Sequence, residues 1–432
     1  MCGIVGAAAQ RDVIPLLING LQRLEYRGYD SAGVAVQSDQ ALLERVRKVG
    51  KVAELMRALQ ENPVSGQTGI AHTRWATHGE PSEQNAHPHV CHERVAVVHN
   101  GIIENHDALR AQQQQGGYRF TSQTDTEVIV HQIDHYLEQG KDLLEAVRLT
   151  VADLEGAFAL GVINKEEPGR MIAARRGSPL VVGIADDEML IASDIAALVA
   201  ETQQFVFLQD GDVADIRHSG MTVYDEHGVE VERPVQTSTV TADATDKGDY
   251  AHYMLKEIFE QPRAIADTLE GRIGANRVIE EAFGVGAGEI FDEVAGVHII
   301  ACGTSYHAGM VGRHWLESIA GIPCSVEVAS EFRYRHPVVR KKSLIVTLSQ
   351  SGETADTLAG LHEARRLGYG HSLSICNVPE SSLVRESDLV LMTHAGPEIG
   401  VASTKAFTTQ LVAMLLLTIV LGRRHGISPE KE

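Results

Sequence analysis

Short β-like runs and helical periodicities alternate along the first half of the chain. The β-like runs predict strands, at Ser31–Gln37, Gly69–Thr73, Arg94–His99, Phe158–Ile163 and Met189–Ser193. Apolar residues at helical spacing predict helices, at Ile14–Leu24, Lys51–Gln60, Thr126–Glu138 and Leu143–Leu154. Residues 1–235 are therefore expected to form an α/β domain.

The pattern changes in the second half. Pro234, Gly248, many threonines and few large apolar residues predict a linker, and a helical stretch follows from Tyr250 to about Phe283, so 236–284 is predicted to be linker and helix. Short apolar runs then alternate with helix-like segments, at Val297–Ala301, Cys324–Val328, Leu344–Leu348, Leu373–Cys376 and Leu389–Met392. This alternation predicts a doubly wound parallel sheet over 285–425. Such sheets bind ligands at the carboxyl ends of their strands.

Composition and charge argue against several classes of protein. The 432 residues carry a net charge of −20, which argues against nucleic-acid binding because phosphate backbones require clustered Lys and Arg. No signal peptide is visible, and the longest apolar run, Leu411–Leu421, is shorter than the ~20 residues of a membrane span, so we expect a buried helix and no membrane partner. Five scattered cysteines make no disulfide framework and favour a cytoplasmic location.

The first residues carry candidate chemistry. Removal of Met1 would leave Cys2 as the terminal residue, with its thiol beside a free α-amine. An α-amine of pKa about 7.7–8.0 can act as general base toward a thiol of pKa about 8.5. One residue would then supply both nucleophile and base. The alternative is a cysteine at position 2 by chance.

Three further motifs suit glutamine as substrate. Arg74 closes a predicted strand and offers a bidentate fork for a carboxylate, although a surface arginine is the alternative. Asn100 and Gly101 close another strand and offer two N–H donors for an oxyanion hole, although a plain Asn-Gly turn is also common. Asp125 precedes a predicted helix and could receive an amino group or cap the helix.

Together these blocks resemble the class II glutamine amidotransferase domain, an N-terminal-nucleophile hydrolase with a four-layer α/β/β/α fold. The resemblance covers residues 2–235. It implies Cys2 as nucleophile, Asn100 and Gly101 as oxyanion hole, and Arg74 and Asp125 as glutamine ligands. It also places Thr77 and His78 in the glutamine-contacting loop and gives Trp75 a role in guarding the passage of ammonia.

Small hydroxyl residues follow three predicted elements of the second domain. The blocks are 302–305, 349–354 and 400–405, each at or near a predicted helix start. Hydroxyls and free N–H groups at a helix N-terminus bind phosphate without formal charge, whereas helix capping alone is the alternative. The blocks resemble the sugar isomerase (SIS) domain, which implies a sugar-phosphate site made of Thr304, Ser305, Ser349, Gln350, Ser351, Thr354, Val401 and Ser403.

A class II glutaminase followed by a SIS domain resembles the glutamine–fructose-6-phosphate aminotransferase family. The resemblance implies glutamine and fructose 6-phosphate as substrates, glucosamine 6-phosphate as product, no cofactor, and a homodimer in the full-length form. That family has two SIS domains. Ser428, Pro429 and Glu430 make a helix-start pattern, so residues 426–432 are expected to begin a further segment. From this we expect glutaminase activity and partial sugar-phosphate binding in residues 1–432, with impaired synthase activity.

Two alternatives remain open at this point. Another class II amidotransferase would lack the Ser349–Thr354 block, and a phosphosugar sensor would bind without hydrolysing glutamine. The segment His87–His92 has a metal-like spacing of His and Cys, but no second cluster completes a tetrahedral site, so we expect no metal.

Overall fold

The structure is a computed structural model, and it describes residues 2–25, 29–38, 42–75, 79–238, 249–274, 277–379 and 381–427. Thr77, His78 and the predicted helix start at Ser428 lie outside these residues. The chain forms two compact units, Met1–Thr245 and Asp246–Glu432. The finer boundaries expected at 235 and 285 stay predictions.

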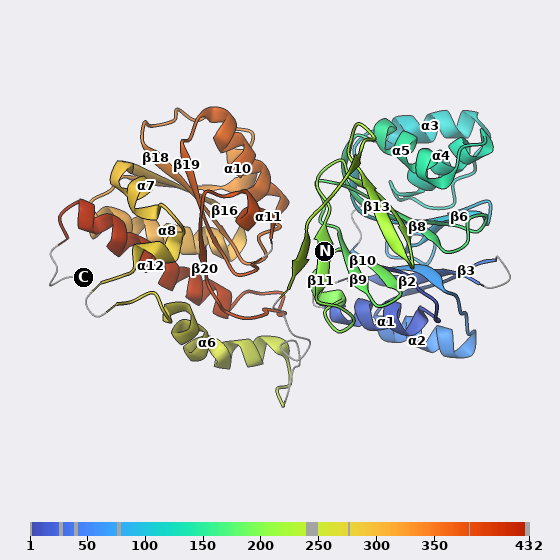
Figure 1. Cartoon of the computed structure of the whole chain (residues 1–432), viewed down its shortest axis with the longest axis horizontal. Coiled ribbons are helices and arrows are strands. Elements are labelled where there is room, and N and C mark those ends of the chain that lie inside the picture. Colours follow the sequence, from blue (N-terminus) through green and yellow to red (C-terminus); the bar gives the residue numbers. More distant parts are fainter. Residues whose placement is uncertain are drawn as a thin grey trace. The chain divides into compact units, whose positions relative to one another are not determined.

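Two antiparallel sheets form the centre of the first unit (Figure 1). The eight-stranded sheet has the order β15-β11-β9-β10-β1-β4-β2-β3 and comprises β1 (Gly3–Ala8), β2 (Ser31–Gln37), β3 (Leu43–Val49), β4 (Thr68–Arg74), β9 (Val181–Ala185), β10 (Glu188–Ala192), β11 (Gln204–Phe207) and β15 (Val235–Thr237). The seven-stranded sheet has the order β14-β13-β12-β8-β7-β6-β5 and comprises β5 (His89–Cys91), β6 (Val95–Ile103), β7 (Gly156–Asn164), β8 (Arg170–Arg176), β12 (Val213–Arg217), β13 (Gly220–Tyr224) and β14 (Glu230–Val231).

Because side chains alternate along each strand, one face of each sheet packs against the other sheet and the opposite face packs against helices. Ile4 and Ile70 of the first sheet share one buried cluster with Ala96 and Val98 of the second, so this cluster lies between the sheets. The outer faces are covered by α1 (Ile14–Arg23) and α2 (Val52–Glu61) on one sheet, and by α3 (His106–Gln115), α4 (Glu127–Glu138) and α5 (Leu143–Asp153) on the other. The four-layer α/β/β/α fold is therefore confirmed.

The second unit is built on a parallel sheet. Its strand order is β17-β16-β18-β19-β20, with β16 (Gly296–Ala301), β17 (Cys324–Val328), β18 (Ser343–Ser349), β19 (His371–Cys376) and β20 (Leu389–Met392). Helices α7 (Ala287–Glu293), α8 (Gly303–Ser318) and α12 (Lys405–Arg424) bury one face. The opposite face is covered by α9 (Ala329–Phe332), α10 (Ala355–Leu367) and α11 (Ser382–Glu386). The doubly wound prediction is confirmed.

The helical stretch predicted from Tyr250 to Phe283 is confirmed only in part, as a helix that ends at Leu269 and a short 3-10 helix at Glu280–Phe283. Helix α6 spans Tyr253–Leu269, and Gly271 then adopts a left-handed φ of +69°, which ends the helix. Helix α6 packs against α12 within the second unit. Among the described residues, only α12 is long and apolar enough to cross a membrane, and 67% of its apolar window is buried in the unit, as in the core helix of a globular domain.

Candidate active site

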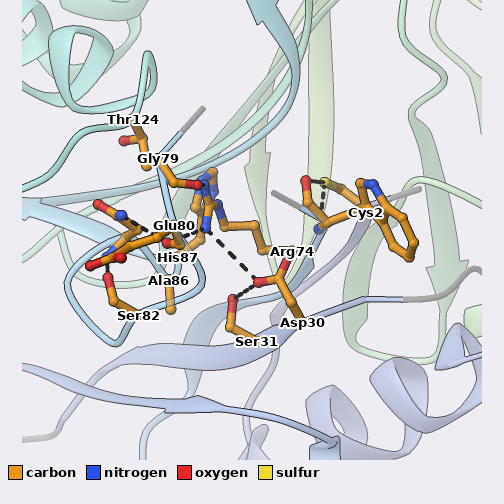
Figure 2. Close-up of polar contacts among 12 residues, drawn as sticks. Cys2, Asp30, Ser31, Arg74, Gly79, Glu80, Ser82, Ala86, His87 and Thr124 are labelled. Atoms are coloured by element: carbon orange, nitrogen blue, oxygen red, sulfur yellow. Dashed lines mark hydrogen bonds and ion pairs between the residues drawn. The ribbon is translucent and has the colours of Figure 1, made fainter. Parts of the chain in front are cut away.

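Cys2 lies where the two sheets of the first unit face each other. It precedes β1, whose Gly3 pairs with Thr73 of β4, so Cys2 adjoins the end of β4. The backbone N–H of Trp75 donates to its Sγ at 3.2 Å (Figure 2). Burial raises the pKa of the thiol, and the Trp75 N–H and the Arg74 charge offset only part of that shift. Forming the thiolate at neutral pH therefore requires a base.

Asn100 and Gly101 lie within strand β6, so the plain-turn alternative is wrong. The side chain of Asn100 faces the space between the sheets, where its Nδ2 donates to the backbone carbonyl of Cys2 at 3.3 Å. Its second N–H has no partner among the described residues and can donate to a developing oxyanion. Gly101 has a φ of +132°, a conformation that favours glycine.

Arg74 is the last residue of β4 and is only 4% exposed, so the surface-arginine alternative is wrong. Its Nη1 lies 3.9 Å from Oδ1 of Asp30, beyond direct hydrogen-bond length (Figure 2). Burial lowers the pKa of the guanidinium, while Asp30, Cys2 and Asp125 raise it. The planar guanidinium can hold a substrate carboxylate through two parallel N–H donors.

Asp125 is buried beside β6, the strand that carries Asn100 and Gly101. Its Oδ2 accepts from the N–H of Ile103 at 2.9 Å, two residues after Gly101. The helix-cap alternative is wrong, because α4 begins at Glu127 and its N-cap residue, Thr126, makes no side-chain cap bond. A buried carboxylate close enough to Arg74 to raise the pKa of its guanidinium suits the amino group of an amino acid.

The structure says less about the other three residues predicted for the glutamine site, Trp75, Thr77 and His78. The indole of Trp75 is 54% exposed, although its backbone contacts Cys2. Thr77 and His78 belong to the undescribed residues 76–78, so their predicted roles stay predictions.

The metal-like segment is divided between two environments. His87 and His89 point into the core, where their Nε2 atoms lie 3.3 and 3.1 Å from the hydroxyls of Thr126 and Thr124. Ligand atoms of Cys91, His92 and Asp134 gather within 4.8 Å of one another. Arg94 pairs with that Asp134 at 2.8 Å, which already balances the carboxylate charge. The prediction of no metal stays untested.

Two of the three hydroxyl blocks flank one point of the parallel sheet. The block 302–305 follows β16 and the block 349–354 follows β18, which is hydrogen-bonded to β16. From β16 the chain crosses to β17 on one side of the sheet, and from β18 it crosses to β19 on the other side. The carboxyl ends of the adjacent strands β16 and β18 therefore form the topological switch point, where such sheets bind ligands. Ser305 and Ser349 are buried, and Thr304 is exposed.

The loop 349–354 is tightly shaped. Ser349 Oγ accepts from the N–H of Gly352 at 2.9 Å and lies 3.3 Å from the Thr354 hydroxyl. Gly352 has a φ of +66°, and a β-carbon there would lie 1.9 Å from Ser381 Oγ, so glycine is required. None of the N-cap residues of α8, α10 and α12 makes a side-chain cap bond, which makes the capping alternative wrong.

The third block contacts a carboxylate of the chain itself. Ser403 donates to the carboxylate of Glu398 at 2.7 Å, and the N–H groups of Thr404 and Ala406 donate to the same carboxylate. Val401 is 87% exposed. The chain's own Glu398 thus occupies the N-terminus of α12, and the described contacts do not bring Val401 and Ser403 together with the other blocks. Sequence reasoning missed Glu398, whose acidic side chain before a helix start was the available signal.

Sequence comparison identifies relatives of both units. The chain matches the family described as glutamine amidotransferase domain over residues 72–200 and the SIS domain family over residues 293–420. It is 58% identical to the glutamine–fructose-6-phosphate aminotransferase (isomerizing) of Pseudomonas syringae pv. tomato, covering 99% of this chain and 70% of that one. The Pseudomonas aeruginosa protein of the same name is 59% identical over 98% of this chain and 69% of its own.

Comparison with solved structures finds a related domain. The C-terminal domain of glucosamine-fructose-6-phosphate aminotransferase from Francisella tularensis is 52% identical, with a TM-score of 0.42, over 43% of this chain and 52% of that one.

Proposed function

Because the chain belongs to the glutamine–fructose-6-phosphate aminotransferase (isomerizing) family, we propose that Cys2 releases the amide nitrogen of glutamine for transfer to fructose 6-phosphate. The product is glucosamine 6-phosphate, and the second product is glutamate. The observation that carries the proposal is that Cys2 contacts Asn100 of β6 and adjoins the end of β4, where Arg74 acts on its thiol.

The first step is formation of a thioester. After removal of Met1, the α-amine of Cys2 takes the thiol proton, and the thiolate attacks the amide carbon of glutamine. Asn100 and Gly101 donate to the oxyanion of the tetrahedral intermediate. The carbon–nitrogen bond then breaks, and the nitrogen leaves as ammonia with the proton from the amine. Water hydrolyses the thioester to glutamate and restores the thiol.

Substrate binding uses charges that burial strengthens. Arg74 would hold the α-carboxylate of glutamine through its fork, and Asp125 would hold the α-ammonium group. Both residues are 4% exposed, so a bound charge interacts with them in a medium of lower polarity than water. Trp75, Thr77 and His78 remain proposed glutamine contacts on the family resemblance.

The second unit would bind fructose 6-phosphate at the switch point of its sheet. Ser349, Gln350, Ser351 and Thr354 would hold the phosphate, with Thr304 and Ser305 on the neighbouring strand end. Val401 and Ser403 stay in the proposed set, and Ser403 would have to share its hydroxyl with Glu398. A homodimer, a cytoplasmic location and the absence of a cofactor are further proposals from the same resemblance.

A direct test measures glutamate release by the wild-type chain and by Cys2→Ala, with Cys91→Ala as a matched control. Cys91 is a buried free cysteine of the same unit. We expect Cys2→Ala to abolish glutamate release and Cys91→Ala to keep it within about threefold of wild type, since Cys91 has no part in the proposed chemistry. Glutamate release that persists in Cys2→Ala would contradict the proposal. So would a wild-type chain that binds fructose 6-phosphate but hydrolyses no glutamine, which is the behaviour of a sensor.

A further inference from the structure

His72 makes a hydrogen bond across the two sheets of the first unit. It lies on β4, two residues before Arg74, and faces the same inter-sheet layer as Ile70. Its Nε2 lies 2.9 Å from Oδ1 of Asn100 on β6, and both side chains are buried. The same Asn100 donates from its Nδ2 to the carbonyl of Cys2. The amide of Asn100 is thus held at both ends.

The chemistry of the partners fixes which way this amide points. The backbone carbonyl of Cys2 can only accept, so the NH₂ end of Asn100 faces Cys2 and the Oδ1 end faces His72. Because Oδ1 can only accept, Nε2 of His72 must carry the proton. Burial lowers the pKa of His72 to about 3, so the ring is neutral near pH 7 and carries its single proton on Nε2.

The ring of His72 is itself held in place. It stacks on His87 with the ring centroids 4.2 Å apart and the planes 14° from parallel. Nδ1 of His87 accepts from the backbone N–H of His99 at 3.3 Å, so His87 is anchored to the strand that carries Asn100. These contacts form a closed chain: Cys2 binds Asn100, Asn100 binds His72, His72 stacks on His87, and His87 binds the strand β6 that carries Asn100. Each contact limits the rotation of the side chains that it joins.

We propose that His72 is a positioning residue for glutamine hydrolysis: its Nε2–H holds Oδ1 of Asn100, so that the Asn100 N–H groups point at Cys2 and at the oxyanion. Without this donor the amide can rotate by 180° and present Oδ1 to the oxyanion, where like charges repel. The inference rests on the proposed glutaminase function of Cys2. No contact of His72 with substrate is required.

Two substitutions of His72 separate positioning from packing. The amide NH₂ of glutamine reaches about as far as Nε2, whereas that of asparagine reaches only as far as Nδ1. We expect His72→Asn to lower the kcat of glutamate release by about 100-fold, as for loss of one oxyanion donor, with the KM for glutamine within about threefold. His72→Gln should restore kcat to within about tenfold of wild type, because it again donates to Asn100.

Three controls accompany the pair. His131→Asn removes another buried histidine of the unit, whose Nδ1 contacts Cys91, and should keep kcat within about threefold. The melting temperature reports loss of packing in every variant. The rate of Cys2 alkylation by iodoacetamide should stay within about threefold in both His72 variants, because alkylation forms no oxyanion.

The outcomes are distinguishable. A wild-type chain with no Cys2-dependent glutamate release would contradict the proposed function itself. An active wild type in which His72→Asn and His72→Gln lose kcat equally, in step with their melting temperatures, overturns the positioning role and leaves the proposed function intact. A rise in KM without a fall in kcat also overturns it.

Discussion

Gly101 and Ala157 approach so closely across the β6–β7 ladder that a β-carbon at position 101 would lie 2.0 Å from the Ala157 carbonyl oxygen. No side chain at position 101 fits without displacing β7. Strand β6, which carries Asn100 and Gly101, can therefore follow this path beside Cys2 only because residue 101 has no side chain. Glycine is required here for steric reasons as well as for its positive φ.

Gly101→Ala should accordingly destroy glutamine hydrolysis and destabilise the first unit. Strain at a positive φ costs of order 1–3 kcal/mol, and the clash adds to it. Gly117→Ala is the matched control, because Gly117 also has a positive φ, +96°, but a β-carbon there meets nothing within 4 Å. It should cost only about 1 kcal/mol and leave kcat unchanged. Thermal melts and glutamate release measure both, and equal effects of the two substitutions would contradict the steric account.

The role of Arg74 is tested by a change that keeps its charge. Arg74→Lys removes the planar fork, so we expect the KM for glutamine to rise by roughly 10–100-fold, while kcat falls less because the fork binds ground and transition states alike. Arg176→Lys is a suitable control, since that guanidinium donates to the carbonyls of Leu154 and Val151. A fall in kcat at constant KM would show that Arg74 acts on the chemical step instead.

How far the sequence predicts this molecule depends on the kind of pattern. Strand β2 matches its predicted range, Ser31–Gln37, because its apolar residues are buried on both faces. Strand β1 was missed because its glycines and alanines carry little strand signal. Helix α3 was missed because its glutamine-rich stretch buries only Leu109 and Gln113. Both elements were missed because the residues within the element itself carry a weak pattern.

Contacts between layers were beyond the sequence for a different reason. The motif containing His72 was visible, and a period of two places His72 and Arg74 on one face of a strand. Nothing in the chain, however, indicates that Asn100 lies opposite, because the two residues come from different sheets. The position of Glu398 before a helix start was visible in the sequence, but its hydrogen bonds to the N–H groups of α12 and to Ser403 were not. The sequence motifs offered candidate catalytic residues, whereas the contacts that orient those candidates could not be predicted from the sequence.

Buried neutral histidines predict an acid-sensitive first unit. Burial lowers the pKa of His72 to about 3 and those of His87 and His89 well below 6.5. Between pH 6.5 and about 3 the unfolded chain binds protons that the folded unit does not, so stability falls as the pH falls. Each such histidine contributes up to about 1.4 kcal/mol per pH unit in that window. Above pH 6.5 these groups add no pH dependence.

Urea unfolding between pH 7 and 5 measures this effect above the range in which unfolded carboxylates titrate. The chain has two tryptophans, so Trp75 fluorescence in a Trp315→Phe background reports on the first unit. We expect His89→Gln to reduce the slope of stability against pH by about one proton. A free energy of unfolding that stays constant from pH 6.5 to 5 would show that the three rings are charged in the folded unit.

Sugar-phosphate binding should depend on which end of the parallel sheet a serine occupies. Ser349 ends β18 at the carboxyl edge, while Ser372 lies near the start of β19 at the opposite edge and bonds to Asp388. Both are buried, so replacing either by alanine loses a buried hydrogen bond. Only Ser349 lies where phosphate is proposed to bind. Losing a hydrogen bond to a charged group there should weaken binding of fructose 6-phosphate by about 10–100-fold.

Ligand-induced stabilisation is the measurement. At 100 times Kd, fructose 6-phosphate stabilises the wild-type chain by about 2.7 kcal/mol, which raises the melting temperature of the second unit. At the same ligand concentration, Ser349→Ala should lose most of this rise. Ser372→Ala should start from a lower melting temperature and still show the full rise, because its defect lies at the edge away from the ligand. If both variants lose the rise equally, destabilisation of the sheet accounts for it, and the assignment of the site to the β16–β18 switch point fails.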